Sequence, residues 1–457
     1  MQAHASLEEK RFSGRGLVKL IVPLMIEQLL AVTVGIADTM MVAGVGEHAV
    51  SAISLVDSIN YLLIFLFSAL ATGGSVVASQ YLGRRDHENA CDTARQLVYS
   101  NIFISLLLAA LAIAFNAAVL KLIYGALSPD VMENAQKYFF LSALSYPFLA
   151  LYNAGAALFR SMGNSKISMI ASLAMNAVNL CDNAVLIYVF KLGVVGAGVA
   201  TLISRALAAV IVTWLLLDSR REIYLKNILR VNFKPAIVRS ILKIGIPSGL
   251  ENSLFQFGKL LVAGIVSAFG TAAIASNAIC GSINSFVCVP GGAIGLALIT
   301  VVGQCVGADR IDLARKHTRT LMLWAYITTA AVCAVLFAFA RPVLGMFNLS
   351  EESIQMSLSV IRVFCVFQAV VWPISFPFPN ALRAAGDAKF TMWVALIAMW
   401  ACRVGLSYVF TYVPFFAKLF GFPLMGIYFA MYCDWIVRDV LFIWRWVSGR
   451  WTRHKVI

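Results

Sequence analysis

Pro23-Leu-Met-Ile-Glu27 and Pro247-Ser-Gly-Leu-Glu251 place a proline and a glutamate at the same spacing, 224 residues apart. The same offset, without a gap, aligns further polar residues: Ser58-Ile59-Asn60 with Ser282-Ile283-Asn284, and Gln80 with Gln304. Apolar stretches can match by chance through leucine and alanine, but proline, glutamate, asparagine and glutamine in register are much harder to match in that way. The chain is therefore predicted to contain two copies of one half. In a membrane protein, this pattern indicates a transporter whose substrate path lies between the halves.

The composition places the chain in a membrane. Of its 457 residues, 61% are hydrophobic and only 13% are charged, and the mean hydropathy is +0.84. A water-soluble protein of this size needs far more charge to cover its surface, whereas an apolar run of about 20 residues is long enough to cross a bilayer as a helix. Twelve such runs predict twelve transmembrane helices: roughly 17–45, 51–80, 96–118, 134–158, 167–190, 196–217, 242–268, 273–305, 320–340, 353–382, 391–416 and 422–446.

The predicted fold is an all-α polytopic membrane protein with two pseudo-symmetric six-helix bundles. Because six is an even number, both halves begin on the same side of the membrane, and their symmetry axis runs along the membrane normal. The N-lobe is expected over 1–217 with helices 1–6, and the C-lobe over 242–457 with helices 7–12. A basic cytoplasmic linker, 218–241, is expected to join them. A weaker echo at an offset of 223 relates two expected cytoplasmic turns, Arg160-Ser-Met-Gly163 and Arg383-Ala-Ala-Gly386.

The formal net charge of +14 raises the question of a nucleic-acid partner. The distribution of charge argues against one, because most of the 36 basic residues fall in segments on the same side as the N-terminus. This positive-inside bias predicts that both termini are cytoplasmic. The basic stretch 218–243 is expected to lie on the anionic inner leaflet. Residues 1–19 are polar and basic, and the apolar run after them is too long for a signal peptide, so they predict a cytoplasmic tail.

The chain carries no recognisable catalytic or metal-binding motif. It contains no Walker A, GxSxG or HExxH sequence. Its nine cysteines are scattered without a CxxC pair, and its five histidines fall in expected tails and loops. We therefore expect neither an enzyme nor a metal site, and no cofactor apart from a coupling ion.

A set of motifs is spread over the whole chain. The set comprises Pro23-Leu-Met-Ile-Glu-Gln28, Gly35-Ile-Ala-Asp38, Gln80-Tyr-Leu-Gly83, Gly193-Val-Val-Gly196, Ile246-Pro-Ser-Gly-Leu-Glu251, Gln304-Cys-Val-Gly307, Leu382-Arg-Ala-Ala-Gly-Asp387 and Asp434-Trp435. Together these motifs resemble the multidrug and toxic compound extrusion (MATE) family of bacterial transporters. The resemblance implies two six-helix bundles arranged as a V. It also implies export of bulky, often cationic, organic compounds in exchange for protons or sodium ions.

Asp38 is the first candidate for ion coupling. It lies in the outer part of predicted helix 1, fifteen residues after Pro23, and carboxylates in a membrane are costly and usually face a cavity. In a cavity of low dielectric such a group can load and release a proton. Pro23 frees a backbone carbonyl in mid-helix and predicts a hinge. By resemblance, protonation of Asp38 is linked to bending of helix 1; the alternative is that Asp38 only hydrogen-bonds a neighbouring helix.

The resemblance also pairs this aspartate with polar residues on helices 5 and 6, which here are Asn179, Asn183 and Thr201. The family often has aspartate at the position of Asn183, and here a carboxylate occurs next to it, at Asp182. A shift of one residue turns a side chain by about 100° around a helix, so Asp182 does not replace that group. Asn176 lies one turn before Asn179 and is expected on the same face, either for substrate or for hydrogen bonds between helices.

Glu27 and Glu251 are repeat mates on predicted helices 1 and 7. Glu27 precedes Asp38 by about three turns, which permits a path with two stations. By resemblance, Glu251 matches a glutamate that helps to bind a cation in the sodium-coupled branch of the family, but Trp372 lies about where that branch carries an aspartate. One carboxylate makes a poor sodium site. Glu251 is therefore expected to take a proton or to form an ion pair with Lys259.

Arginines also fall in or near the predicted spans, at Arg205, Arg362, Arg403 and Arg438. Because few acids are available to pair with them, some are expected to extend to the inner membrane surface. Arg438 lies one turn beyond Asp434, and the two predict an ion pair on helix 12.

The leading function is secondary active antiport, in which organic, cationic amphipathic compounds leave the cell in exchange for protons, or alternatively for sodium. The expected partners are small organic molecules and the lipid bilayer, and the chain is expected to act as a monomer. The alternative is a flippase for lipid-linked precursors, of the same broad superfamily. Such flippases tend to have a strongly cationic central cavity and extra helices, so transport assays with drugs discriminate between the two.

Overall fold

The computed structural model describes residues 12–125, 127–226, 228, 230, 232–347, 349–454 and 456–457. The tail was expected over residues 1–19; residues 1–11 lie outside the described part, and a helix begins within the rest, at Gly14. Every regular element among the described residues is a helix, and nine of the described helices are each long and apolar enough to cross a membrane. Tertiary contacts divide the chain into two compact units, residues 1–249 with Ile457 and residues 250–456. We call these the N-unit and the C-unit; the lobe boundaries expected from the sequence stay predictions.

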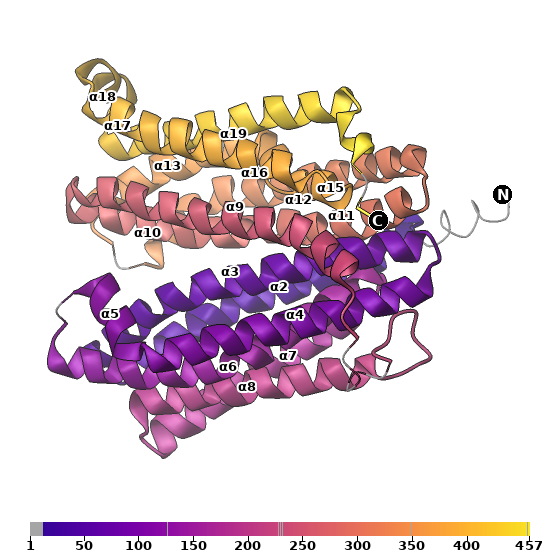
Figure 1. Ribbon diagram of the computed structural model, residues 1–457. Coiled ribbons are helices and arrows are strands. Elements are labelled where there is room, and N and C mark those ends of the chain that lie inside the picture. Colours follow the sequence, from indigo (N-terminus) through magenta and orange to yellow (C-terminus); the bar gives the residue numbers. More distant parts are fainter. Residues whose placement is uncertain are drawn as a thin grey trace. The chain divides into compact units, whose positions relative to one another are not determined.

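The N-unit is a helical bundle built around one central helix. Helix α6 packs against α3, α4 and α8, and α7 packs against α2 and α8 (Figure 1). The helices of this unit are α2 (Gly14–Ala43), α3 (Glu47–Gly83), α4 (His87–Ala114), α5 (Asn116–Tyr124), α6 (Pro129–Ser161), α7 (Ser165–Asn183), the π-helix η1 (Ala184–Val189) and α8 (Gly193–Leu216). Helix α9 (Pro235–Ser267) begins in this unit.

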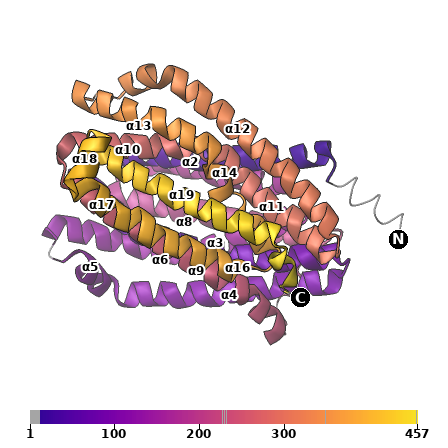
Figure 2. The ribbon, with the colours of Figure 1, turned by 90° about the horizontal axis from the view of Figure 1, so that it is seen from above.

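The C-unit repeats the same order of helices with more breaks. Helix α11 packs against α12 and α15, and α19 runs beside α17 and η2, as two views show (Figures 1 and 2). The helices are α10 (Gly270–Val287), α11 (Val289–Gly307), α12 (Ile311–Gly345), α13 (Glu351–Val370), α14 (Trp372–Ser375), α15 (Pro379–Ala384), α16 (Ala388–Ile397), the π-helix η2 (Ala398–Leu406), α17 (Ser407–Tyr412), α18 (Pro414–Phe420), α19 (Pro423–Val447) and the 3₁₀ helix η3 (Arg450–Arg453).

The prediction of twelve spans is confirmed, since each predicted run lies on a helix or on a set of consecutive helices. The structure extends some spans beyond their apolar runs. Helix α12 begins at Ile311, nine residues before the predicted start. Its first turns carry Asp312, Arg315 and Lys316, so the apolar run from which the span was predicted begins later than the helix. The predicted run 353–382 is divided into three helices. A proline inside a helix removes a backbone hydrogen bond and kinks or breaks the helix, and the sequence Trp372-Pro-Ile-Ser-Phe-Pro-Phe-Pro379 contains three prolines within eight residues.

The two turns that echo each other in sequence also share a backbone conformation. Gly163 follows α6 with φ +76°, and Gly386 follows α15 with φ +96°. Residues other than glycine rarely adopt backbone conformations with positive φ. The shared glycine therefore reflects the same sharp turn in both repeats.

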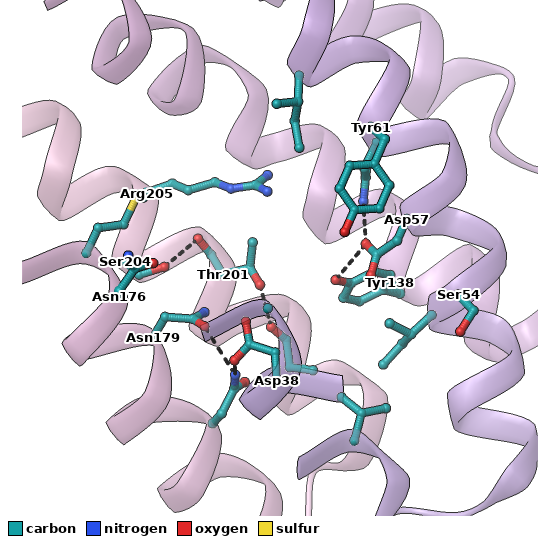
Figure 3. Close-up of a pocket in the computed structure, with 18 of the residues that line it drawn as sticks. Asp38, Ser54, Asp57, Tyr61, Tyr138, Asn176, Asn179, Thr201, Ser204 and Arg205 are labelled. Carbon is teal, nitrogen blue, oxygen red and sulfur yellow. Dashed lines mark hydrogen bonds between the residues drawn. The ribbon is translucent and has the colours of Figure 1, made fainter. Parts of the chain in front are cut away.

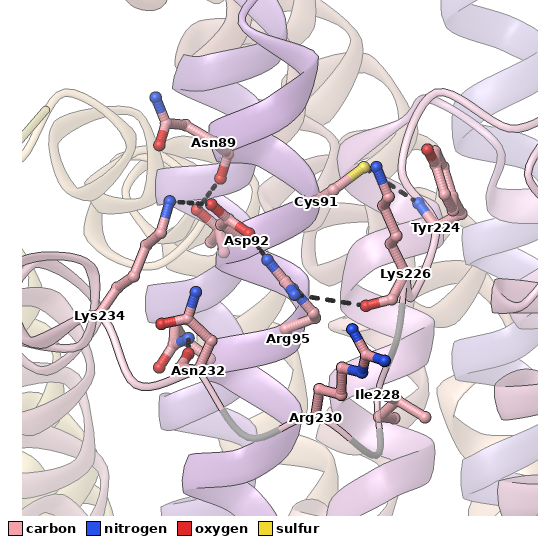
Figure 4. A network of polar contacts seen from close by, with 12 residues as sticks. Asn89, Cys91, Asp92, Arg95, Tyr224, Lys226, Ile228, Arg230, Asn232 and Lys234 are labelled. Atoms are coloured by element: carbon pink, nitrogen blue, oxygen red, sulfur yellow. Dashed lines mark hydrogen bonds and ion pairs between the residues drawn. The ribbon is translucent and has the colours of Figure 1, made fainter.

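The basic linker between the halves lies against α4. Its anchor is Asp92, which forms ion pairs with Arg95 of the same helix and with Lys234 (Figure 4). The backbone of the linker is bound as well: Gln96 donates to the Asn232 carbonyl at 2.6 Å, and Tyr99 to the Ile228 carbonyl at 2.8 Å. Backbone carbonyls need donors when they leave water, so these contacts fix the path of the described part of the linker on the N-unit.

Candidate functional site

A cavity of about 250 Å³ opens among α2, α3, α6, α7 and α8 of the N-unit (Figure 3). We call it the N-unit cavity. It brings together five residues that the sequence nominated: Asp38, Asn176, Asn179, Asn183 and Thr201. These residues come from three helices and from positions as far as 163 residues apart in the sequence, so the fold is needed to assemble them.

Two amides hold the carboxylate of Asp38. Nδ2 of Asn183 donates to Oδ1 of Asp38 at 3.0 Å. The Asn179 amide, with its nitrogen facing the carboxylate, lies 3.0 Å from Oδ1 and 3.1 Å from Oδ2. Asn179 and Asn183 are one turn apart on α7, which puts both amides on one side of the helix. Amide donors favour the ionised carboxylate, whereas its partial burial opposes ionisation.

Asp57 is a second acid in the same cavity, and the sequence analysis missed it. Oδ1 of Asp57 accepts from Nδ2 of Asn60 at 3.1 Å and from the Tyr138 hydroxyl at 3.2 Å. Asn60 in turn accepts from the Tyr146 hydroxyl at 2.9 Å. The signal was present: Asp57 lies within the predicted span 51–80, and the cost of a membrane carboxylate applies to it as it does to Asp38.

Arg205 is the cation of this cavity. The expectation that some membrane arginines extend to the inner surface does not hold for Arg205, which lines the cavity and donates from Nη1 to the Ser145 hydroxyl at 2.7 Å. Figure 3 shows its guanidinium on the same side of the cavity as Thr201 and facing Tyr61. Two carboxylates and one guanidinium leave one negative charge in excess when both acids are ionised.

The remaining nominated residues of the N-unit lie outside the lining of this cavity. Asp182 is half-buried, and its Oδ2 has no hydrogen-bond partner among the described residues. Glu27 pairs with Arg160, with Nη1 at 3.1 Å from Oε1, and also accepts from the Ser168 hydroxyl. Pro23 lies inside α2, one turn before Glu27, and the helix continues through it. Its role as a hinge stays a prediction.

Glu251 mirrors Glu27. Its Oε1 lies 2.6 Å from Nη2 of Arg383, and Arg383 also donates to the side chain of Asn380 at 2.9 Å. Arg160 and Arg383 are the arginines of the two echoing turns, so each repeat joins its first helix to the same turn by the same kind of ion pair. Of the two expectations for Glu251, the ion pair with Lys259 is therefore wrong. Lys259 lies eight residues further along α9, and its ammonium is 5.8 Å from the ring of Phe255.

A second cavity, of about 410 Å³, lies within the C-unit among α9, α10, α13, α14, η2 and α19. We call it the C-unit cavity. Lys259 and Arg403 line it together with aromatic side chains, and none of the described residues that line it is an aspartate or a glutamate. Trp372, predicted at the position of a missing acid, forms part of its wall and is buried.

The two cavities are lined from equivalent positions of the repeat. At an offset of 224, Gly35, Asp38, Asp57 and Asn60 of the N-unit cavity correspond to Lys259, Val262, Gly281 and Asn284 of the C-unit cavity. At an offset of 223, Arg205 corresponds to Tyr428, which also lines the C-unit cavity. Both acids have therefore been replaced by uncharged residues, and a lysine stands where the first half has glycine.

Comparisons with known proteins agree with the duplication. The sequence model of the MatE family matches residues 23–185 and again residues 247–409. The chain is 30% identical over 456 residues to the "Uncharacterized transporter YisQ" of Bacillus subtilis, covering 97% of this chain and 95% of that protein. It is 26% identical over 448 residues to the "Probable multidrug resistance protein NorM" of Thermotoga maritima, covering 96% and 94%.

Solved structures share the fold. The structure described as MATE in the straight conformation superposes with a TM-score of 0.88 at 19% sequence identity, covering 96% of both chains. Sequence identity at this level supports the fold alone, and that fold has twelve transmembrane helices in two bundles.

Proposed function

The chain belongs to the MatE family of membrane transporters, and we propose that it exports cationic amphipathic organic compounds in exchange for ions, with protons favoured over sodium. The observation that carries this proposal is the N-unit cavity, in which Asp38 is held by two asparagine amides and shares the space with Asp57 and Arg205. Membrane carboxylates that face a cavity are typical of ion and substrate pathways.

The charge of the cavity supports exchange. With Asp38 and Asp57 ionised against Arg205, one negative charge is left over, and either a proton or an organic cation can neutralise it. Because burying an uncompensated charge is costly, the cavity favours one cation at a time. Binding of a proton therefore disfavours binding of the drug, and this competition is the requirement of an antiporter.

The contacts of the acids favour protons over sodium. Asn179 and Asn183 present N–H donors to Asp38, whereas a hard cation such as sodium requires several oxygen ligands. In the C-unit, Glu251 is engaged by Arg383 and its Oε2 has no partner among the described residues. A protonated carboxylate needs only one acceptor, so binding a proton at Asp38 requires a smaller rearrangement of the surrounding side chains than binding sodium does.

We also propose that the transporter works as a monomer in the bacterial cytoplasmic membrane, with both termini and the linker on the cytoplasmic side. The positive-inside bias of the sequence supports this orientation. It is tested with single cysteines introduced into a variant without the nine native ones, at Gly46, Ser128 and Arg220, all exposed positions. Membrane-impermeant reagents added outside should label the first two and not the third; labelling at position 220 would reverse the orientation.

The export function is tested in a bacterial host that lacks its own efflux pumps. Expression of the wild-type chain should lower the accumulation of lipophilic cationic dyes and raise resistance to cationic drugs, and a protonophore should abolish the effect. If the chain instead changes only the transfer of lipid-linked precursors and leaves every dye unaffected, the flippase alternative replaces this proposal.

A further inference from the structure

Two residues that line the C-unit cavity carry buried hydrogen-bond donors without acceptors. Arg403 is 6% exposed, and its Nε has no hydrogen-bond partner among the described residues. Trp435 is 2% exposed, and its indole Nε1 is likewise without a partner. Both residues line the cavity. Buried donors are costly when they are unmatched, so an acceptor would stabilise them. Both atoms are closed to solvent in this structure, and the lining side chains must shift before a ligand acceptor reaches them.

The charges around the cavity also favour a ligand that carries acceptors, because cations outnumber acids there. Arg403 and Arg438 share a single acid, Asp434, with Nη2 of Arg403 at 3.0 Å from Oδ2 and Nε of Arg438 at 2.7 Å from Oδ1. Lys259 adds a further cation, for which the structure shows no ion pair with a described residue. The other acid of this stretch, Asp439, accepts from Ser375 at 2.6 Å and does not line the cavity. Positive charge is therefore in excess at the lining.

The walls of the cavity are aromatic. Trp372 and Phe376 are stacked with centroids 5.6 Å apart, and Phe376 meets Trp435 edge-on at 6.0 Å. The guanidinium of Arg403 lies 5.0 Å from the ring of Phe255. A volume of about 410 Å³ is sufficient for a bicyclic aromatic compound. The flat walls offer stacking, and the cations offer a partner for an acidic substituent.

From this combination we propose that the C-unit cavity is a binding site for aromatic organic anions. The carboxylate of the ligand accepts from Arg403 and Lys259, and its ring lies among Trp372, Phe376 and Trp435. The repeat supports this assignment independently, because Asp38 and Asp57 of the N-unit cavity are replaced at equivalent positions by Val262 and Gly281. As a step in transport, the site rests on the proposed export function and extends its substrates to compounds that carry an acidic group.

Three probes with the same ring test the site: 2-naphthoate, 2-naphthalenemethanol and 2-naphthylmethylammonium. Binding of each to the purified full-length protein is measured by isothermal titration calorimetry, with empty micelles as the blank. We expect 2-naphthoate to bind at least about tenfold more tightly than the alcohol, because it alone engages the cations, and the ammonium compound to bind more weakly than 2-naphthoate. Equal affinity of all three, or preference for the ammonium compound, would overturn the assignment.

Variants place the site in the C-unit. Lys259→Gln should weaken 2-naphthoate binding about tenfold, and Lys259→Arg should restore it. The side chain of Lys259 is exposed toward the cavity and makes no ion pair with any residue that the structure describes. Asp38→Asn is the matched control, since it changes the N-unit cavity and should leave this affinity unchanged. Unaltered binding of 2-naphthoate by Lys259→Gln contradicts the proposal. If the wild-type protein binds 2-naphthoate but does not transport it, the result contradicts the proposed export of this compound and leaves the binding site in place.

Discussion

The N-unit cavity and the C-unit cavity are lined from the same positions of two repeats and carry opposite charge. The ion pairs near the middle of the two repeat-mate helices, Glu27–Arg160 on α2 and Glu251–Arg383 on α9, are retained in both units. The acids that line the first cavity are absent from the second. The difference separates residues that hold helices together, which both copies keep, from residues that face a ligand, which have diverged.

The largest expected effect comes from placing asparagine at two equivalent positions of the repeat, Asp38 and Val262. Asp38→Asn should abolish export of cationic compounds, because it removes the titratable group and retains the shape of the side chain. Val262→Asn places the same side chain at the repeat mate and should leave this export intact. Dye efflux from cells that express matched amounts of each variant checks the pair. Wild-type export by Asp38→Asn would assign Asp38 a structural role.

The shared ion pairs should contribute to folding to a similar extent in both units. Arg160→Met and Arg383→Met each leave a buried glutamate without its cation, and each should destabilise the protein by about 3 kcal/mol. The arginine side chains are 16% and 15% exposed, which supports comparable losses. Thermal unfolding of the purified variants in one detergent measures both. A loss confined to one variant would show that the two pairs have diverged as the cavities have.

A positive charge introduced into the N-unit cavity, like that of the C-unit cavity, should lower its affinity for cations. Gly35→Lys introduces the lysine found at the repeat mate, and a Cβ built on Gly35 meets no atom within 4 Å, so steric strain is small. We expect about a tenfold loss of affinity for a cationic drug, because the cation meets a like charge. Gly35→Gln, of similar size without charge, is the control. Equal losses in both variants would indicate that the effect is steric.

The smallest expected effect concerns the linker on α4. Asp92→Asn removes the acid shared by Arg95 and Lys234, and hydrogen exchange of the linker should increase by an amount that corresponds to about 1 kcal/mol. The value is modest because both cations are partly exposed. The exposed pair Arg310–Asp312 provides the control, and Asp312→Asn should not change exchange of the linker. If hydrogen exchange of the linker is unchanged in Asp92→Asn, Asp92 does not anchor the linker.

Hydropathy predicted the spans well because the bilayer imposes a minimum apolar length on every helix. It could not predict where α12 begins, since the helix continues into charged residues such as Arg315 and Lys316 outside the apolar run. The breaks after Val370 were readable from three prolines in eight residues, but the orientation of Trp372 toward a cavity depends on the packing of α14 against α19.

The site was partly predictable. Asn179 and Asn183 meet Asp38 as the family resemblance implied, whereas Asp57 was missed although its span was identified. Lys259 was one of two expectations for Glu251, the other being a proton, because charges buried in a membrane commonly pair. Arg383 is 132 residues away and was recognisable only from its echo with Arg160. Local spacing finds partners on one helix, and only tertiary structure or the repeat finds the others.

The most direct test of the account measures which ion drives export in proteoliposomes that contain the purified protein. A cationic dye should accumulate when a proton gradient is imposed in the absence of sodium, and Asp38→Asn should abolish this accumulation. Glu251→Gln should impair it less, since Glu251 is engaged by Arg383 in the structure. Strict dependence on a sodium gradient, with Glu251→Gln the more damaging change, would place the coupling site in the C-unit and contradict the account.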